Sequence, residues 1–319
     1  MHYVAGIDGG GTKTAVAVMD RDGRIVREFT ADGINYNGRK AEEVERALGE
    51  IFAGLGSTCG SLAALRQLVI GAAGISHPAV PERLAAAARG NGYEGGLHIF
   101  GDHEAALYGA LNGREGMLLI AGTGSICCGR SASGEFARTG GFGHLIDDEG
   151  SGYSIGRSLL AAAVRASDGR GPATVITRLL AEWHGLASPA DIVGFVYAAD
   201  TGKKEIAALA PLLTEACDLQ DAVAHGIAIH SAAALVDLVA ALARRLSLAE
   251  SRLALAGSVL LKSPYVRAAF GRQLETALPP LRTVSPQLGA AAGAAHLALQ
   301  LAAFPSQESV LLRRKDFDE

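Results

Sequence analysis

Short apolar runs separated by glycine-rich turns open the chain. The runs Tyr3–Ile7, Thr14–Met19 and Ile25–Thr30 have the length of strands, and Gly9–Thr12 and Asp20–Gly23 separate them. Apolar runs bounded by such turns are typical of antiparallel hairpins. The pattern therefore predicts a three-stranded meander at the N-terminus.

The spacing of apolar residues then changes to that of a helix. Residues 44, 48, 51, 52 and 55 are apolar within Lys40–Leu55, a periodicity that predicts one buried helical face. The other elements predicted before residue 112 are the strands Leu68–Ala73 and Leu97–Phe100 and the helices Pro81–Arg89 and Glu104–Leu111. Strands followed by helices in this way indicate an α/β fold.

The opening pattern returns after residue 113. Met117–Ala121 is apolar and runs into a second glycine turn and a second short strand. Thr12 precedes Gly23 by eleven residues, and Thr123 precedes Gly134 by eleven residues. We interpret this as an internal duplication that gives two lobes of one topology, each with a glycine hairpin facing a shared cleft.

The duplication divides the chain into an N-terminal lobe over 1–112 and a C-terminal lobe over 113–287. The C-terminal lobe is predicted to contain the helices Gly150–Arg165, Asp221–Leu246 and Pro264–Leu278 and the strand Arg252–Ala256. Leu288–Phe304 is apolar and mostly alanine, which favours a buried helix over a membrane span, and this helix is expected to complete the N-terminal lobe. The charged tail Gln307–Glu319 is expected to fray.

Composition excludes several classes of protein. With 49% apolar and 19% charged residues, the 319-residue chain is not disordered, and its net charge of 29 − 33 = −4 does not suit a nucleic-acid-binding protein. Glycine accounts for 41 residues and gathers in turns without a collagen period. The four cysteines have no C-x-x-C spacing, so we expect buried, reduced thiols.

The two glycine hairpins are the strongest candidates for phosphate binding. The chain lacks both the P-loop and the dinucleotide-binding motif. Consecutive backbone N–H groups in a glycine turn can cradle an anion, and Thr12 and Lys13 can donate to phosphate. Asp8 can hold Mg²⁺ directly or through water. Either hairpin alone could be a plain turn, but two at equivalent positions favour phosphate binding.

Carboxylates supply the other candidate chemistry. Asp102 follows a predicted strand, where α/β proteins place catalytic groups, and either a general base or a helix N-cap would suit it. The segment Gly140–Gly152 combines glycines with Asp147–Glu149 and is predicted to line a polar ligand pocket. Gly257 and Ser258 form a weaker candidate for a third nucleotide contact.

Together these motifs resemble the actin-like ATPase superfamily. DGGGTKT at 8–14, GTGSI at 122–126, GGFGH at 140–144 and DEGSG at 148–152 are similar to the BadF/BadG/BcrA/BcrD-type ATPase family, in particular its N-acetylglucosamine kinase branch. The resemblance implies two duplicated, ribonuclease H-like lobes with a nucleotide and sugar cleft between them. It also implies a homodimer.

The resemblance assigns a role to each matching residue. Asp8 takes the metal position, and Asp102 takes the position of the base that deprotonates the sugar 6-hydroxyl. The ATP-binding positions fall on Gly9, Gly10, Gly11, Thr12, Lys13, Gly122, Thr123, Gly124, Gly257 and Ser258. The sugar-binding positions fall on Asn35, with Asn37 as a rival, and on Ser125, Gly141, Phe142, Gly143 and Asp148.

The function implied is a cytoplasmic kinase that uses ATP and Mg²⁺ to phosphorylate the 6-hydroxyl of N-acetylglucosamine, N-acetylmuramic acid or glucosamine. Phe142 replaces the usual Trp and Asp147 the usual Gly, which leaves the preferred amino sugar open. One alternative is an activator ATPase of a 2-hydroxyacyl-CoA dehydratase or benzoyl-CoA reductase, which would need a cysteine pair for an iron–sulfur cluster. A regulator that binds ATP without transfer is another, although Asp102 speaks against it.

Overall fold

The computed structural model describes residues 2–36, 39–72, 74–75, 77 and 79–303. The predicted frayed tail and Asn37 lie outside the described residues. The chain forms two compact units. Unit 1 comprises the described residues of Met1–Glu115, Ala132–Gly134 and Ser285–Glu319, and unit 2 comprises Gly116–Ser131 and Glu135–Val284.

Unit 1 contains a five-stranded sheet in the order β3-β2-β1-β4-β5. Its elements are β1 Tyr3–Gly9, β2 Lys13–Asp20, β3 Ile25–Asp32, α1 Ala41–Cys59, the 3-10 turn η1 Leu62–Ala64, β4 Leu65–Ala72, α2 Ala79–Gly90, β5 Gly96–Gly101, α3 Asp102–Leu111 and α12 Ala290–Ala303. The first three strands form the predicted antiparallel meander, and β4 and β5 run parallel to β1. The hairpin and helix predictions for this half are therefore confirmed.

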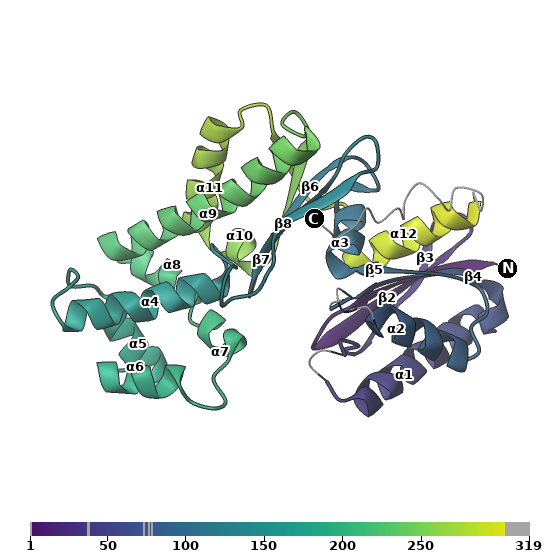
Figure 1. The fold of residues 1–319 in the computed structure, drawn as a ribbon, viewed down its shortest axis with the longest axis horizontal. Coiled ribbons are helices and arrows are strands. Elements are labelled where there is room, and N and C mark those ends of the chain that lie inside the picture. The colour runs from purple at the N-terminus through teal and green to yellow at the C-terminus, as the bar shows by residue number, and fades with distance from the viewer. Residues whose placement is uncertain (1, 37–38, 73, 76, 78, 304–319) are drawn as a thin grey trace. The chain divides into compact units, whose positions relative to one another are not determined.

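Helices cover both faces of this sheet (Figure 1). Alternate residues of β1 point to opposite sides, so Ala5 and Ile7 pack with α1 and α2, whereas Val4 packs with α3 and α12. The alanine-rich composition of α12 permits a close approach. A Cβ on Gly6 would overlap the backbone of α12 at Ala295, so β1 and α12 pack backbone to backbone at this point.

Unit 2 repeats the sheet of unit 1. Its elements are β6 Gly116–Ala121, β7 Ser125–Arg130, β8 Phe136–Gly140, α4 Gly152–Ser167, α5 Ile176–His184, α6 Pro189–Val196, α7 Lys203–Ala207, α8 Pro211–Asp218, α9 Ala222–Leu246, β9 Arg252–Ala256, α10 Ser258–Lys262, α11 Pro264–Ala277 and β10 Arg282–Val284. The order β10-β9-β6-β7-β8 again joins an antiparallel meander to two parallel strands. The predicted duplication is thus present in the two sheets.

The units differ in the helices inserted after the third strand. Unit 1 inserts α1 between β3 and β4, whereas unit 2 inserts α4 to α9 between β8 and β9. Among the described residues, α9 is the helix long and apolar enough to cross a membrane. Core helices pass the same test, and Leu235, Val239 and Leu242 of α9 are buried in the core of unit 2.

Two short strands of unit 2 escaped the sequence analysis. Neither β8 nor β10 carries an apolar run that stands out, because β8 contains Arg138 and Thr139 and β10 has three residues. All four cysteines, which lie at positions 59, 127, 128 and 217, are buried free thiols as predicted.

Candidate active site

Asp8 and Asp102 lie at one edge of the unit 1 sheet. Gly9 of β1 is level with Ala72 of β4, and Ala72 is level with Gly101 of β5. Asp8 precedes this row by one residue and Asp102 follows it by one residue. The two carboxylates therefore come from strands two spacings apart, about 10 Å across the sheet.

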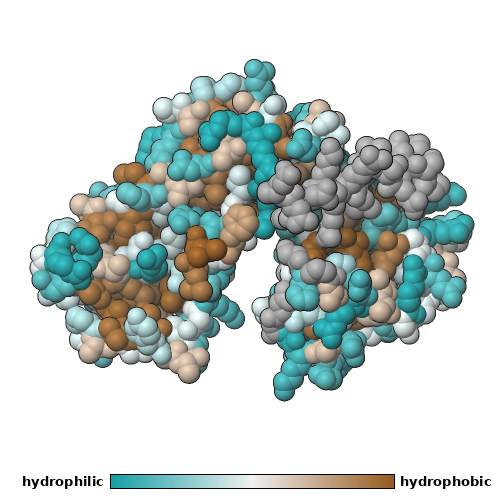
Figure 2. Space-filling view, viewed as in Figure 1, coloured by the Kyte–Doolittle hydropathy of each residue, from teal (hydrophilic) through white to brown (hydrophobic). Residues whose placement is uncertain are grey.

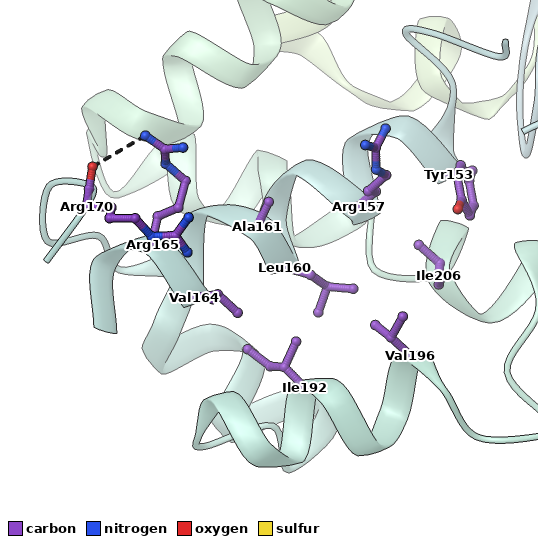
Figure 3. Close-up of a pocket in the computed structure, with 10 residues that line it drawn as sticks. All are labelled: Tyr153, Arg157, Leu160, Ala161, Val164, Arg165, Arg170, Ile192, Val196 and Ile206. Atoms are coloured by element: carbon purple, nitrogen blue, oxygen red, sulfur yellow. Dashed lines mark hydrogen bonds between the residues drawn. The ribbon is translucent and has the colours of Figure 1, made fainter. Parts of the chain in front are cut away.

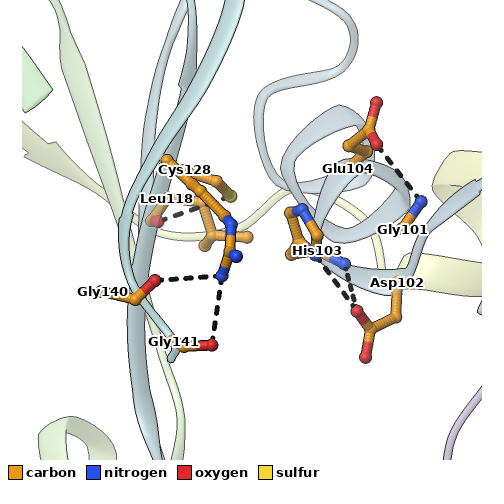
Figure 4. Close-up of polar contacts among 9 residues, drawn as sticks. Gly101, Asp102, His103, Glu104, Leu118, Cys128, Gly140 and Gly141 are labelled. Atoms are coloured by element: carbon orange, nitrogen blue, oxygen red, sulfur yellow. Dashed lines mark hydrogen bonds and ion pairs between the residues drawn. The ribbon is translucent and has the colours of Figure 1, made fainter. Parts of the chain in front are cut away.

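The two carboxyl groups have opposite electrostatic settings. Burial, together with the charge of Asp102, raises the pKa of Asp8 to about 6. Burial also opposes ionisation of Asp102, but hydrogen bonds from His103 outweigh it and hold the pKa of Asp102 below its usual value. Asp102 Oδ1 accepts from the His103 backbone N–H at 2.8 Å and lies 3.3 Å from its Nδ1 (Figure 4). Asp102 therefore ionises at lower pH than Asp8 does.

The structure corrects the alternative that Asp102 is a helix cap. The N-cap of α3 is Gly101, whose N–H donates to Glu104 Oε1 at 3.2 Å, and Asp102 is the first helical residue (Figure 4). The carboxylate of Asp102 is 43% exposed. It thus combines a fixed backbone with an accessible oxygen, as a general base requires.

The first glycine hairpin joins β1 to β2. Gly11, Thr12 and Lys13 are exposed at its tip, so their polar groups are accessible. Arg39 Nε donates to the carbonyl of Gly11 at 3.1 Å, which fixes the turn from outside. Asn35 stands beside it, with its Nδ2 3.9 Å from where a Cβ on Gly11 would lie.

The setting of Asp8 fits a magnesium ion. No cluster of three or more His, Cys, Asp or Glu side chains suited to a metal occurs among the described residues. Mg²⁺ commonly takes one or two carboxylates and completes its shell with phosphate oxygens and water. A partly buried carboxylate whose pKa is raised by burial and by a like-charged neighbour would gain from a cation. Asp8 beside an exposed phosphate hairpin meets these requirements.

The second glycine hairpin lines a cavity inside unit 2. This cavity has a volume of about 610 Å³, within the usual range for a ligand site. It contains three residues predicted to bind ATP, which are Gly122, Thr123 and Ser258. The hairpin and the start of α10 therefore face one cavity.

Most of the cavity wall escaped the sequence analysis. Its apolar part includes Ile155, Ala207, Ala208, Pro211 and Val259, and its polar part includes Lys204, Thr214, Glu215, Asp218 and Lys262. These residues come from α4, α7 and its C-cap, α8 and α10, which no short motif marks. Of these residues, Lys262 could have been predicted from the sequence, since it lies one helical turn after Ser258.

The predicted sugar-binding loop, within the segment Gly140–Gly152, has a fixed base and an exposed tip. Arg138 Nη1 donates to the carbonyls of Gly140 and Gly141 at 3.1 Å, and both glycines are labelled in Figure 4. The Arg138 guanidinium also lies 4.5 Å from the centre of the Phe142 ring. Asp147 Oδ2 accepts from the Phe142 N–H at 2.8 Å. Beyond this base Phe142 is 60% exposed, and the loop residues 145 and 146 are more than four-fifths exposed.

Ser125 and Asp148, both predicted to bind sugar, have polar atoms engaged by protein partners. Asp148 is 2% exposed and accepts from the Ser125 N–H at 3.0 Å. The Ser125 hydroxyl donates to the Glu149 carbonyl at 2.7 Å. In contrast, Gly141, Phe142 and Gly143 remain at the surface.

A second cavity of about 450 Å³ lies along α4 and α6 (Figure 3). Apolar side chains such as Leu160, Val164 and Ile192 form its floor, and Arg157 and Arg165 stand on α4 beside them. Apolar residues also gather over this group of helices on the face shown in Figure 2. None of the predicted site residues lines this cavity.

The duplicated sheets, each with a glycine hairpin, define an actin-like ATPase fold. The chain belongs to the BadF/BadG/BcrA/BcrD ATPase family, whose sequence model matches residues 5–298. It is a phosphotransferase with an alcohol acceptor.

Three relatives illustrate this similarity. The chain is 36% identical over 301 residues to an N-acetylmuramic acid/N-acetylglucosamine kinase of Clostridium acetobutylicum, which covers 93% of this chain and 98% of the relative. It is 28% identical over 256 residues to an N-acetyl-D-glucosamine kinase of Dictyostelium discoideum. This match covers 76% of this chain and 80% of the relative. The fold matches that of a candidate N-acetylglucosamine kinase of Chromobacterium violaceum with a TM-score of 0.74 and 23% sequence identity. This match covers 94% of this chain and 99% of the other.

Proposed function

We propose that this enzyme transfers the γ-phosphoryl group of ATP to the 6-hydroxyl of N-acetylglucosamine or a close relative such as N-acetylmuramic acid or glucosamine. The observation that carries the proposal is the setting of Asp102. Its ionised, accessible carboxylate lies at the carboxyl edge of a sheet, beside Asp8 and a glycine hairpin. The names of the two relatives point to the acceptor class.

Asp102 is the base in this proposal. Phosphoryl transfer depends mainly on positioning and charge stabilisation, with a carboxylate that accepts the proton of the acceptor hydroxyl. The hydrogen bond from the His103 backbone occupies one oxygen, Oδ1, and Oδ2 would accept the proton of the acceptor hydroxyl. Because the pKa of Asp102 is below its usual value, the carboxylate is ionised at neutral pH and ready to accept a proton.

The glycine hairpins serve the nucleotide. Thr12, Lys13 and the backbone N–H groups of Gly9–Gly11 would hold phosphate oxygens, and Asp8 would hold Mg²⁺ directly or through water. Mg²⁺, when bound, supplies charge neutralisation at the phosphates. In unit 2, Gly122, Thr123 and Gly124 would contact phosphate, while Gly257 and Ser258 with the apolar wall of the cavity would receive adenosine.

In this proposal Asn35 would bind the acetamido group of the acceptor, and the exposed Gly141–Gly143 segment is a further candidate for sugar contact. An asparagine amide both donates and accepts hydrogen bonds, so it can pair with both atoms of an acetamido group. A primary 6-hydroxyl projects furthest from a hexosamine ring. It is therefore the hydroxyl best able to reach the base.

The cysteines argue against the activator ATPase considered above. An iron–sulfur cluster bound by this chain would need accessible thiolates. All four cysteines of the chain are buried, and burial raises the pKa of Cys59 and Cys217 to about 11. The thiols therefore remain protonated and enclosed.

A coupled ADP-release assay tests the proposal. Purified enzyme would be given ATP and Mg²⁺ with N-acetylglucosamine, N-acetylmuramic acid, glucosamine or glucose, and without sugar. We expect ADP release with an amino sugar and much less with glucose. Glucose has no nitrogen substituent to pair with the Asn35 amide, and an unpaired polar group in a closed site costs about 1–3 kcal/mol. ADP release that does not depend on any sugar would contradict the kinase assignment.

A further inference from the structure

Asp148 differs in kind from the other buried carboxylate of the described chain. The buried polar side chains there include two carboxylates, Asp148 and Asp221. Asp221 caps α9 and accepts from neutral donors at residues 174, 175 and 224. Asp148 instead has a cationic partner, since its Oδ2 lies 2.6 Å from Lys203 Nζ. No aligned hydrogen bond accompanies this contact, so it is an ion pair.

The backbone of Asp148 is itself constrained. Its φ of +67° lies in the left-handed region, which residues other than glycine rarely adopt. Such a conformation persists only where surrounding contacts hold it. The Ser125 N–H and the ammonium of Lys203 are the contacts that hold this side chain.

The segment after Asp148 is joined to the second glycine hairpin by hydrogen bonds. The Ser125 hydroxyl donates to the Glu149 carbonyl, and the Gly152 N–H donates to the Gly122 carbonyl, both at 2.7 Å. The Tyr153 N–H donates to the Thr123 carbonyl at 3.3 Å. The end of the predicted sugar-binding loop and the hairpin therefore move as one body.

Lys203 connects this body to the wall of the nucleotide cavity. It is the first residue of α7, and the next residue, Lys204, lines the cavity together with Ala207. Gly124 lies between the partners, because a Cβ there would be 2.6 Å from Lys203 Nζ and 2.7 Å from Asp148 Oδ1. The ion pair therefore connects the predicted sugar-binding loop to α7 and passes next to the second glycine hairpin.

We propose that Asp148 and Lys203 form a positioning pair that fixes the sugar-binding loop, the second phosphate hairpin and α7 in one arrangement. This inference rests on the proposed function and assigns Lys203 a role that no motif indicated. Asp148 is buried and Lys203 is partly exposed, so the pair contributes little net stability, yet the loss of Lys203 would leave the buried carboxylate without its cation. Its effect is therefore geometric, and both substrates depend on it.

The test compares Lys203→Met, Lys203→Arg and the double variant Asp148→Asn/Lys203→Met with the wild type. Lys203→Met should lower kcat/KM for both ATP and the amino sugar by ~10–100-fold, as misplacement by about 1 Å can do. Lys203→Arg should recover most of this loss, because it restores the charge. The double variant leaves no unpaired charge, so it remains folded and informative if Lys203→Met does not fold, and it should still lose kcat/KM for both substrates.

Asp221→Asn is the matched control, since it changes a buried carboxylate without a cationic partner. It should lower the melting temperature and leave both KM values unchanged. A Lys203→Met enzyme with wild-type kcat and KM values, or a double variant with wild-type kinetics, would overturn the proposal. So would a loss in Lys203→Met that Lys203→Arg fails to recover.

Calorimetry with a non-hydrolysable ATP analogue separates this inference from the proposed acceptor. The measurement contains no sugar, so Lys203→Met should weaken analogue binding ~10-fold even if the acceptor is not an amino sugar. Unchanged analogue affinity would contradict the link to the nucleotide cavity, whatever the acceptor.

Discussion

The two glycine hairpins occupy equivalent places in the two sheets, yet their surroundings differ. In unit 1, β1 and β2 close at Gly9 and Thr14 around residues 10–13, beside a carboxylate whose pKa is raised to about 6. In unit 2, β6 and β7 close at Ala121 and Ser125 around residues 122–124, beside the ion pair of the buried Asp148 with Lys203. The first turn is one residue longer, and its tip is exposed.

This difference suggests different roles for the two copies of the duplicated fold. Unit 1 inserts α1 after its third strand, and the carboxyl ends of its strands carry the partly buried Asp8 and the accessible carboxylate of Asp102. Unit 2 inserts α4 to α9 after its third strand, and these helices build a cavity around the hairpin. We infer that unit 1 supplies reactive carboxylates, while unit 2 supplies shape for the nucleotide.

The largest effect is expected at the base. Asp102→Asn should lower kcat by ~10²–10⁴-fold and leave ATP-analogue binding unchanged, because a general base contributes on that scale. The neighbouring variant Glu104→Gln is the control, since it retains an oxygen to accept from the Gly101 N–H. Single-turnover kinetics and calorimetry provide the two readouts. Near wild-type turnover in Asp102→Asn would remove the catalytic role from unit 1.

Asp8→Asn should raise stability while it lowers kcat by less than Asp102→Asn does. The folded protein binds the Asp8 proton more tightly than the unfolded chain does, because burial raises the folded pKa to about 6. The stabilisation is full below about pH 4 and is lost as the pH rises through about 6, a change of up to about 3 kcal/mol. Asn carries no charge and avoids this loss.

Urea denaturation at several pH values would measure this effect. Asp8→Asn should be more stable than the wild type at pH 8, by about 1–3 kcal/mol, and nearly equal to it at pH 4. An advantage that does not change with pH would show that the raised pKa is not its cause.

The sequence predicted the fold well because strong local signals mark its repeated parts. Apolar runs and glycine turns specified β1, β2, β6 and β7, and the equal spacing of Thr12 and Thr123 indicated the duplication. Two strands of unit 2 were missed because their side chains are polar or few. The sequence predicted Asp102 as a candidate base, but its pKa depends on burial and on the hydrogen bonds from His103, which the structure shows.

The wall of the cavity in unit 2 could not be predicted in the same way. Lys204, Thr214 and Glu215 approach the second hairpin only through the packing of α7 and α8, and no spacing in the chain records that packing. The partnership of Asp148 with Lys203 likewise joins residues far apart in sequence. Contacts between residues so far apart in the chain are seen only in the structure.

The threonines compare the hairpins directly. Thr12→Val and Thr123→Val should each raise the KM for ATP ~10-fold with little change in the KM for sugar, as loss of one hydrogen bond to a charged group predicts. Thr139→Val is the control, because its hydroxyl donates to the Leu238 carbonyl and does not line the cavity. An increase confined to the KM for sugar would contradict phosphate binding by that hairpin.

The smallest effect is expected at Asp147. Asp147→Gly removes the acceptor for the Phe142 N–H and loosens the base of the sugar-binding loop. The KM for the amino sugar should rise by ~3–10-fold, the scale of one hydrogen bond, with the KM for ATP unchanged. Steady-state kinetics with each substrate varied in turn would check this. A change in the KM for ATP alone would place Asp147 on the nucleotide side.

The site of phosphorylation tests the central claim most directly. Enzyme, ATP, Mg²⁺ and N-acetylglucosamine would be incubated, and phosphorus–proton correlation spectra of the product would locate the new phosphate ester. The account predicts a coupling between phosphorus and the two protons on carbon 6, and none from a reaction with Asp102→Asn over the same period. A phosphate on carbon 1, or inorganic phosphate as the sole product, would contradict the account.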